Sequence, residues 1–333
     1  MSNNQNSMNA LQFSETGTPD TVLQLTKISI PEPGPNEIRI KVRASPINPA
    51  DLLFIQGTYR QKPVFPQTAG LEGTGIIDKV GPGVARAKGQ LVAFRHKGAW
   101  AEYVILPLDK IIELPGDFPL EKACQMALNP ITAYALLKET KLKRNDWLVV
   151  TAGNSAIAQI IVQLAQLKKI NTILVVRSWS QNDDEYLKKL GAKAVLESNS
   201  KDLADRIVKL TNAEGINSIV DAVGGDITNI LLNTLKPGGM MITYGLLSNE
   251  KVSFHNSEII FKNITIKGFG VDYWLNTLTT KELLKMHSFL TTTIGKPNFI
   301  MPAVKKYNAK KIQSALQDYK THRNGKIVLT QFQ

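Results

Sequence analysis

Small side chains fill the segment from Thr151 to Ala158, which lies between a short apolar stretch and a stretch with helical spacing. Dinucleotide-binding folds need small residues at such a strand-to-helix turn, because the backbone must approach the pyrophosphate. The N-terminus of the helix then offers free N–H groups to the phosphate charge. Gly153 is the only glycine of the segment, so the segment by itself also fits a plain strand–turn–helix. We interpret it as a candidate nucleotide-binding turn.

The next strand along the chain, residues 172–177, carries a residue that bears on cofactor choice. NAD-dependent enzymes usually place Asp or Glu about 20 residues after the glycine turn, where it binds the ribose 2′-hydroxyl. Counted from Ala156, that position falls near Arg177. Arginine suits a 2′-phosphate through charge-assisted hydrogen bonds, although a surface arginine at a strand end is the alternative. We predict NADP(H) as the cofactor.

Strands and helices alternate around the turn. Short apolar stretches at 147–153, 172–177, 194–198, 216–225 and 240–245 are separated by stretches with helical periodicity. Such alternation, with helices of about 10–15 residues, is typical of βαβ units and a parallel sheet. The remaining parts of the chain alternate apolar stretches with Gly/Pro turns, which is typical of a mostly β module.

These patterns predict an α/β protein of two domains. A Rossmann domain with a doubly wound parallel sheet, residues 123–262, is inserted into a β-rich domain that is built from residues 1–122 and 263–333. Residues 1–7 are expected to be disordered. A cleft between domains is a favoured ligand site, so we expect the substrate there.

Composition narrows the class of protein. Hydrophobic residues make up 43% of the chain and charged residues 20%, an ordinary globular mixture without an apolar run long enough to span a membrane. The single cysteine, Cys124, excludes an intramolecular disulfide and makes the cytoplasm the default compartment. The formal charge of +12 comes as scattered lysine pairs, which indicates a solvated surface or attraction for an anionic ligand. No nucleic-acid partner is expected, because no recognisable motif accompanies the charge.

The chain resembles the medium-chain dehydrogenase/reductase superfamily over essentially its whole length, on the segments 47–59, 70–84, 190–195 and the turn. The resemblance implies a GroES-like β-rich catalytic domain, a Rossmann domain and an oligomeric oxidoreductase. Zinc-dependent members carry cysteine where this chain has Asn48, and histidine where it has Leu71. Without these ligands, no metal is expected in the catalytic site.

Within the superfamily, the closest resemblance is to 2-enoyl thioester reductases, on NPITAY (129–134), GNSAIAQ (153–159), VVR (175–177) and FKNITIKGF (261–269). Quinone and alkenal reductases share the more general patterns. If the enoyl reductase resemblance holds, it implies cofactor contacts at Asn129, Asn154, Ser155, Ala156, Ile157, Arg177, Ser178, Trp179, Tyr244, Gly245, Leu246, Leu247, Phe269, Gly270, Val271 and Lys326.

Tyr59 matches the catalytic tyrosine of the enoyl reductases. A phenol with a reference pKa of about 10 remains protonated at neutral pH and can supply a proton to the substrate; packing against cofactor or substrate is the alternative. Asn48 could position substrate or water, or simply form an Asn-Pro turn, the role that we favour for Asp51. The family has glycine at Ala158 and commonly an aromatic at Gly270, so the packing of the turn and the width of the substrate pocket can differ.

Three functions compete. The first is NADPH-dependent reduction of a 2-enoyl thioester on CoA or an acyl carrier. The second is NADPH-dependent reduction of a quinone or alkenal. The third is a catalytically weak protein that binds nucleotide or RNA on the same scaffold. A homodimer is expected by resemblance, through the strand-like segment 262–270, which would otherwise leave an edge open for pairing.

Overall fold

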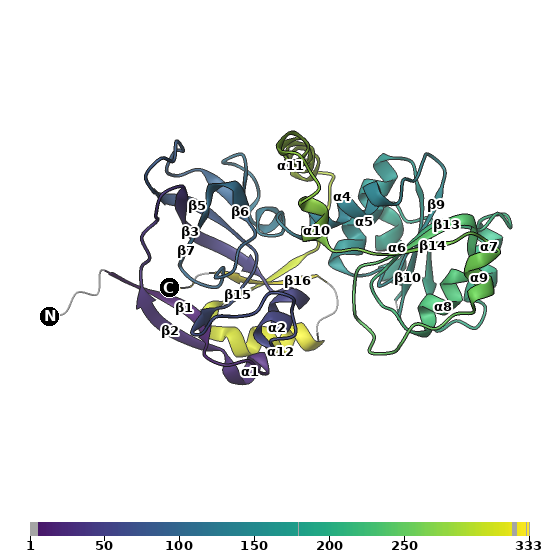
Figure 1. The fold of residues 1–333 in the computed structure, drawn as a ribbon, viewed down its shortest axis with the longest axis horizontal. Coiled ribbons are helices and arrows are strands. Elements are labelled where there is room, and N and C mark those ends of the chain that lie inside the picture. Colours follow the sequence, from purple (N-terminus) through teal and green to yellow (C-terminus); the bar gives the residue numbers. More distant parts are fainter. Residues whose placement is uncertain (1–5, 179, 322–324, 331, 333) are drawn as a thin grey trace. The chain divides into compact units, whose positions relative to one another are not determined.

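The computed structural model describes residues 6–178, 180–321, 325–330 and 332. The chain divides into two compact units (Figure 1). Unit 1 comprises Met1–Leu128, Phe289–Asn298 and Pro302–Gln333, and unit 2 comprises Asn129–Ser288 and Phe299–Met301. Within the described residues, no helix combines the length and the apolar character that a membrane span requires.

Unit 2 is built on a parallel sheet. Its strands lie in the order β11-β10-β9-β12-β13-β14, and each neighbouring pair is parallel. Several of these strands are buried along most of their length and read as continuous apolar runs, as expected when helices cover both faces of a sheet. The strands are β9 (Trp147–Val150), β10 (Asn171–Val176), β11 (Ala194–Glu197), β12 (Ile216–Asp221), β13 (Leu235–Thr243) and β14 (Thr265–Gly268).

Helices connect these strands, with α5 on one side of the sheet and α7 and α8 on the other (Figure 1). This arrangement confirms the predicted doubly wound Rossmann architecture. The helices of this part of the chain are α4 (Asn129–Glu139), α5 (Ala156–Leu167), α6 (Gln181–Lys189), α7 (Leu203–Leu210), α8 (Asp226–Leu232), α9 (Asn256–Ile260), α10 (Val271–Leu275) and α11 (Thr280–Gly295).

Unit 1 is rich in β-structure. One sheet follows the order β15-β16-β3-β5-β6-β8, with β7 also paired to β3, and a smaller sheet has the order β2-β1-β4. The strands are β1 (Ser7–Phe13), β2 (Gln24–Ser29), β3 (Glu37–Pro46), β4 (Gln67–Thr68), β5 (Gly73–Val80), β6 (Leu91–Phe94), β7 (Tyr103–Pro107), β8 (Ile111–Glu113), β15 (Val304–Asn308) and β16 (Lys326–Thr330).

Short helices complete unit 1 and close its core. They are α1 (Pro19–Val22), α2 (Pro49–Ile55), α3 (Leu120–Ala123) and α12 (Ile312–Thr321), with 3₁₀ turns at Leu108–Lys110 and Ala309–Lys311. The C-terminal strand β16 pairs antiparallel with β3, so that Val328 lies opposite Pro46. This pairing brings the two ends of the chain into one domain and places β16 beside the residues that follow β3.

The structure corrects the predicted division of the chain. The second domain boundary was expected at residue 263, but β14 pairs with β13 and completes the parallel sheet of unit 2. The unit boundary instead falls at Ser288, inside α11. Local sequence pattern identifies a strand but not its partner, which explains the misplacement. The first boundary lies after Leu128 rather than 122, and β1 begins at Ser7; residues 1–5 lie outside the described residues.

Candidate functional site

The turn after β9 requires its glycine. A Cβ atom on Gly153 would lie 2.7 Å from the Cβ of Leu174 on the neighbouring strand β10, closer than real Cβ contacts allow. The preceding residue, Ala152, has a φ of 49°, which an L-residue rarely adopts. The chain therefore turns tightly against the sheet at the position that the sequence predicted.

The first turn of α5 leaves backbone donors open. Ser155 caps the helix, because its hydroxyl accepts a hydrogen bond from the Ala158 amide at 3.3 Å. Among the described residues, the amides of Ala156 and Ile157 have no hydrogen-bond acceptor. Free N–H groups at the positive end of a helix dipole form an anion-binding site. This site can take the pyrophosphate of a dinucleotide.

The end of β10 offers a second place for negative charge. Arg177 and Ser178 directly follow the last residue of β10, Val176, and both are exposed. Within the described part of the chain, Arg177 has neither an ion pair nor a hydrogen-bond partner. Its guanidinium is thus available for a phosphate. Trp179, the third predicted contact of this segment, lies outside the described residues.

The ends of β12 and β13 meet in a polar network. Asp221 accepts hydrogen bonds from the hydroxyls of Thr151, at 2.7 Å, and Thr228, at 2.8 Å. A Cβ atom on Gly245 would lie 2.5 Å from the carbonyl oxygen of Ala222, so the loop after β13 also depends on glycine.

Tyr244 adds an unsatisfied group to this edge. Its hydroxyl oxygen is buried and has no hydrogen-bond partner among the described residues. Burial, with a contribution from the nearby charge of Asp221, raises the pKa of this phenol above its ordinary value. A buried polar atom without a partner is uncommon, and a bound ligand would satisfy it. Leu246 and Leu247 follow and expose apolar side chains, at 85% and 61%.

We call these strand ends the carboxyl edge of unit 2: the turn at Asn154–Ile157, Arg177 and Ser178, Tyr244–Leu247, and Phe269–Val271 after β14. All of them follow parallel strands and therefore gather at one edge of the sheet. Asn129 begins α4 in the same unit. The open amides, the free guanidinium and the orphaned hydroxyl fit a dinucleotide that carries an additional phosphate on its ribose.

Lys326 belongs to unit 1, where it joins a group of buried polar residues that we call the buried network: Asn48, Asp51, Glu72 and Lys326. The ammonium of Lys326 donates to Oδ1 of Asn48, and Nδ2 of Asn48 donates to Oε2 of Glu72 at 2.9 Å. Asp51 accepts from the amides of Asn48 and Leu71, both at 2.7 Å. The other oxygen of Glu72 accepts from the amides of Ala127 and Leu128, at 3.0 and 2.8 Å.

Burial dominates the electrostatics of this network. Desolvation raises the pKa of Asp51 to about 7, although two backbone hydrogen bonds oppose the rise. Desolvation also raises the pKa of Glu72 and lowers that of Lys326, and the attraction between these two groups opposes both shifts. Because each charge has partners, the network is a paired arrangement rather than an isolated buried ion.

Tyr59 lies on the same unit, in the loop after α2. Its backbone amide donates to the carbonyl of Leu53 at 3.0 Å, which ties the loop to the helix. The ring is half-buried against the apolar core of unit 1. The guanidinium carbon of Arg60 lies 5.7 Å from the ring centroid. The phenol is therefore held on a fixed backbone near a positive charge.

Two parts of the chain match families of known proteins. Residues 34–116 match the alcohol dehydrogenase GroES-like domain, and residues 156–288 match the family described as zinc-binding dehydrogenase. The mitochondrial enoyl-[acyl-carrier-protein] reductase of Xenopus tropicalis is 31% identical over 93% of this chain and 91% of its own length. That of Dictyostelium discoideum is 30% identical over 96% and 94%.

The chain belongs to the medium-chain dehydrogenase/reductase superfamily. Solved structures of the superfamily have the same fold. A mycobacterial quinone oxidoreductase superimposes with a TM-score of 0.85 at 27% identity, covering 97% of this chain and 99% of its own. The mitochondrial 2-enoyl thioester reductase Etr1p/Etr2p heterodimer of Candida tropicalis gives 0.86 at 26%, with the same coverage. The predicted superfamily and fold are confirmed.

The buried network occupies positions that the superfamily resemblance linked to zinc. Asn48 stands where zinc-dependent members have cysteine, and its amide is engaged by Lys326 and Glu72 instead. Leu71 is buried and offers no ligand atom. Among the described residues, no cluster of three or more His, Cys, Asp or Glu side chains is placed to hold a metal ion.

The sequence reasoning missed the partners of these residues. The sequence predicted Lys326 as a cofactor contact and did not single out Glu72, and the structure joins the two side chains through Asn48. The contact of Lys326 with the cofactor stays a prediction. The signal was present, because an acidic residue retained beside Leu71 in an apolar segment needs a buried partner. Asn48 is only 1% exposed, which favours its scaffold role over contact with substrate. Asp51 has the structural role that the sequence favoured.

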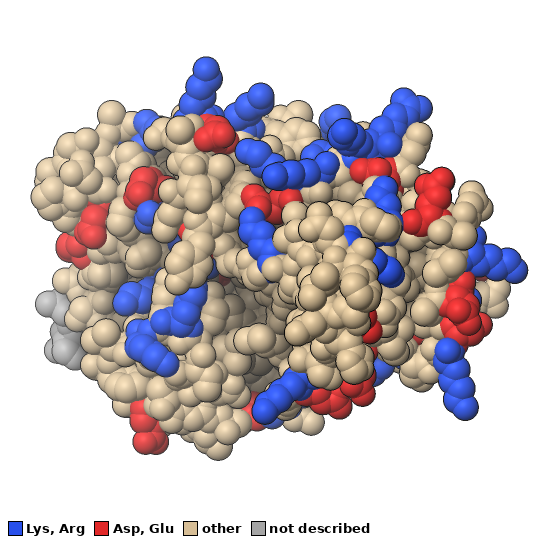
Figure 2. Space-filling model, turned by 45° about the vertical axis from the view of Figure 1, so that its right-hand side comes forward, with Lys and Arg blue, Asp and Glu red and all other residues tan. Residues whose placement is uncertain are grey.

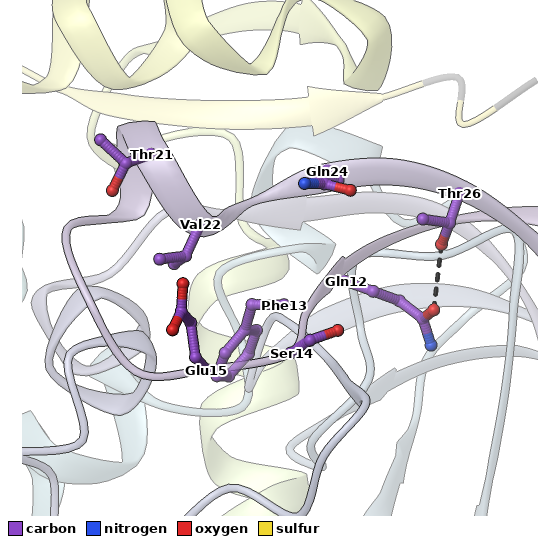
Figure 3. Close-up of a pocket in the computed structure, with 8 residues that line it drawn as sticks. All are labelled: Gln12, Phe13, Ser14, Glu15, Thr21, Val22, Gln24 and Thr26. Atoms are coloured by element: carbon purple, nitrogen blue, oxygen red, sulfur yellow. Dashed lines mark hydrogen bonds between the residues drawn. The ribbon is translucent and has the colours of Figure 1, made fainter.

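Other features belong to neither group. Cys124 is buried, and burial, with a smaller contribution from the charge of Glu72, raises the pKa of its thiol. Figure 3 shows a pocket of about 270 Å³, lined by residues of β1, α1, β2 and the loop before α1, where Glu15 is the only ionisable side chain. No predicted site residue lines it. Figure 2 shows Lys and Arg dispersed over the visible face and interleaved with Asp and Glu, as expected for a solvated surface.

Proposed function

We propose that this protein is an NADPH-dependent reductase that transfers hydride to the activated double bond of a 2-enoyl thioester. One observation carries the proposal: relatives that align over more than nine-tenths of both chains bear the name enoyl-[acyl-carrier-protein] reductase. The presence of Tyr59 at the position of the family's catalytic tyrosine supports it. The carrier, CoA or an acyl carrier protein, is part of the substrate class.

The carboxyl edge of unit 2 supports NADPH as the cofactor. The open amides of Ala156 and Ile157 suit the pyrophosphate, and Arg177 suits a 2′-phosphate because no acidic residue directly follows β10. A superfamily structure at 25% identity, of an Etr1p mutant, is a complex with NADP and crotonyl-CoA. When bound, NADPH supplies the hydride.

The residues of unit 1 account for the other half of the reaction. Hydride addition at the β-carbon leaves negative charge on the thioester carbonyl oxygen, and the α-carbon then needs a proton. Tyr59 supplies it: its O–H bond breaks as the α C–H bond forms, and solvent reprotonates the phenolate. Asn48, fixed between Lys326 and Glu72, positions the segment before α2.

A quinone or alkenal reductase is the second candidate. The mycobacterial quinone oxidoreductase covers 97% of this chain with a TM-score of 0.85, and such an enzyme uses the same hydride donor without a pantetheine-bound substrate. The alternative of a catalytically weak binding protein is disfavoured, because Tyr59 is present at the position of the family's catalytic tyrosine and Arg177 at the position that suits a 2′-phosphate.

The test is NADPH oxidation with crotonyl-CoA and 1,4-benzoquinone as parallel substrates, each repeated with NADH. Turnover of crotonyl-CoA with a preference for NADPH is the expected result. Oxidation of NADPH by the quinone alone would assign the protein to the quinone reductases. Chelation of metal ions before the assay is expected to leave the rate unchanged, because neither Asn48 nor Leu71 is a zinc ligand.

We further propose that the protein forms a homodimer through β14. This edge strand is exposed along its whole length, and Phe261 and Tyr273 beside it in sequence are exposed by 84% and 77%. An open strand edge with apolar neighbours is a pairing surface. The substitution Ile266→Pro removes a strand N–H and is expected to give a monomer in light scattering, while a dimeric variant would contradict this interface.

Location in the cytoplasm remains a prediction from cysteine content.

A further inference from the structure

Gln159 lies near the start of α5 and is buried, although its side chain is polar. Its side-chain amide donates to the carbonyl of Asn154 at 3.0 Å, and its side-chain oxygen accepts from the hydroxyl of Tyr186 at 3.1 Å. Asn154 belongs to the turn after β9, whereas Tyr186 belongs to α6. One side chain therefore bonds to two segments of unit 2 that are distant in sequence.

The bond to Asn154 fixes one peptide group of the nucleotide-binding turn. The N–H of this peptide, that of Ser155, donates to the carbonyl of Ala152 at 2.8 Å. Its carbonyl, that of Asn154, accepts from Gln159. Because a peptide group is planar, holding both of its polar atoms sets the direction in which the chain enters α5. The open amides at the start of this helix follow directly, so their direction depends on Gln159.

Hydrogen-bond chemistry fixes the orientation of the Gln159 amide. A backbone carbonyl can only accept, so the NH2 group of Gln159 faces Asn154 and its oxygen faces Tyr186. Tyr186 must then donate its O–H, and burial raises the pKa of this phenol above its ordinary value, so the O–H is retained at neutral pH. An ionised glutamate has no donor and could not make both bonds.

The bond to Tyr186 connects the turn with the segment that carries Arg177. α6, which contains Tyr186, begins at Gln181, shortly after Arg177. Ser180 caps this helix: its hydroxyl accepts from the amide of Asp183 at 3.2 Å, and the carboxylate of Asp183 accepts from the amide of Ser180 at 3.0 Å. These bonds fix the start of α6, and the location of α6 constrains where the guanidinium before it can reach.

α6 and the residues after it also contact α5 further along. Gly191, which follows α6, has a φ of 117°, and a Cβ atom on it would lie 2.8 Å from the side-chain amide carbon of Gln166. Gln159 and Gln166 lie about two turns apart on one face of α5. The two contacts hold α6 against α5 and thereby fix the distance between the helix amides and the Arg177 segment.

We propose that Gln159 is a positioning residue for the cofactor: it holds the turn amides and the Arg177 segment at the separation that lets one NADPH molecule contact both. This inference rests on the proposed use of NADPH. It assigns part of the selectivity for NADPH to a residue that acts through the two phosphate-binding segments. A glutamine that only satisfied buried polar groups would contribute to stability without affecting selectivity.

Tyr186→Phe separates the two bonds, because it removes the hydroxyl and leaves the bond of Gln159 to Asn154. We expect the affinity for NADPH to fall by about 3- to 10-fold, the worth of one neutral hydrogen bond, and that for NADH, which has no 2′-phosphate, to change by less than about twofold. Gln159→Met removes both bonds and should weaken both nucleotides, NADPH more than NADH. In that background Tyr186→Phe should have no further effect. Isothermal calorimetry measures all four proteins.

Gln163→Met is the matched control. Gln163 is also a buried glutamine of α5, and its side-chain amide bonds to the backbone of Gln159 and Ile300 rather than to the turn. The variant should lower the thermal stability and leave the ratio of the two affinities unchanged. The proposal is overturned if Tyr186→Phe weakens NADPH and NADH equally or weakens neither, or if Gln163→Met shifts the ratio as much as Gln159→Met does.

An activity assay with crotonyl-CoA separates this inference from the proposed function. If crotonyl-CoA is not reduced but Tyr186→Phe weakens NADPH binding selectively, the proposed reaction fails and the role of Gln159 stands. If crotonyl-CoA is reduced but Tyr186→Phe leaves both affinities unchanged, the reaction stands and the role of Gln159 fails. A parent protein that binds neither nucleotide overturns both.

Discussion

The carboxyl edge of unit 2 and the buried network of unit 1 both gather polar groups, but they differ in how these groups are satisfied. At the carboxyl edge, two helix amides, the Arg177 guanidinium and the Tyr244 hydroxyl have no partner among the described residues. In the buried network, the side chains of Asn48 and Glu72 bond to groups of the same unit. Hydrogen-bond donors without partners are typical of a ligand-binding site. Charged groups that bond to one another are typical of residues that stabilise the fold.

This difference separates the residues that should determine the stability of the fold from those that should determine the affinity for a ligand. A buried charge that loses its partner is costly, so the network should dominate stability. Open donors at a helix end and a strand end cost little while water reaches them, so they should dominate ligand affinity. The variants below test this division.

The largest expected effect is on stability. Lys326→Met leaves Glu72 buried without its cation, and we expect the free energy of unfolding to fall by about 3–5 kcal/mol. Chemical denaturation followed by circular dichroism measures it. Lys305→Met is the matched control, because its ion pair with Asp318 is exposed on the lysine side and should change stability far less than the loss of the buried Lys326. Equal losses in both variants would mean that the network is not the scaffold.

The pH dependence of stability sharpens the same point. Burial raises the pKa of Asp51 from 3.8 to about 7, so between these values the folded state holds a proton that the unfolded state has lost. The contribution of Asp51 to stability therefore decreases as pH rises through this window. Asp51→Asn is expected to flatten the change, as measured by denaturation at a series of pH values. An identical pH profile in the two proteins would contradict this protonation.

Cofactor preference tests the carboxyl edge. Arg177→Ala is expected to weaken NADPH binding by about 10- to 100-fold, the worth of charge-assisted hydrogen bonds to a phosphate, while NADH binding stays the same. Quenching of protein fluorescence by each nucleotide measures both affinities. Arg144→Ala, on the loop before β9, is the charge-matched control. Equal weakening of NADPH and NADH would show that Arg177 does not recognise the 2′-phosphate.

The smallest expected effect is that of Tyr244→Phe, which should raise the stability of the nucleotide-free protein and lower its affinity for NADPH. Tyr244→Phe removes a buried hydroxyl that lacks a partner, and it is expected to stabilise the nucleotide-free protein by about 1 kcal/mol. The same change should weaken NADPH binding, since a bound nucleotide would satisfy that hydroxyl. Thermal unfolding with and without NADPH measures both. A loss of stability without nucleotide would mean that the hydroxyl already has a partner.

The sequence predicted the carboxyl edge better than the network, for a physical reason. Gly153, Ser155 and Arg177 lie in one βαβ unit, where the spacing along the chain fixes the position in space. Lys326 and Asn48 are 278 residues apart, and only the pairing of β16 with β3 brings them together. Neighbouring residues in the sequence carry no information about such a pairing.

The same limit explains the misplaced domain boundary. The segment 262–270 was recognised as a strand, but its pairing with β13 depends on the whole sheet. Tyr59 could be named in advance because the family resemblance, rather than any local pattern, identified it.

Reduction of crotonyl-CoA by NADPH in D2O, with Tyr59→Phe in parallel, tests the central claim most directly. The account predicts a product with solvent deuterium at the α-carbon and the hydride at the β-carbon. It also predicts a rate that falls by about 100- to 10,000-fold in Tyr59→Phe, the usual contribution of a general acid. No reduction of crotonyl-CoA, together with NADPH oxidation by 1,4-benzoquinone that Tyr59→Phe leaves unchanged, would contradict the account.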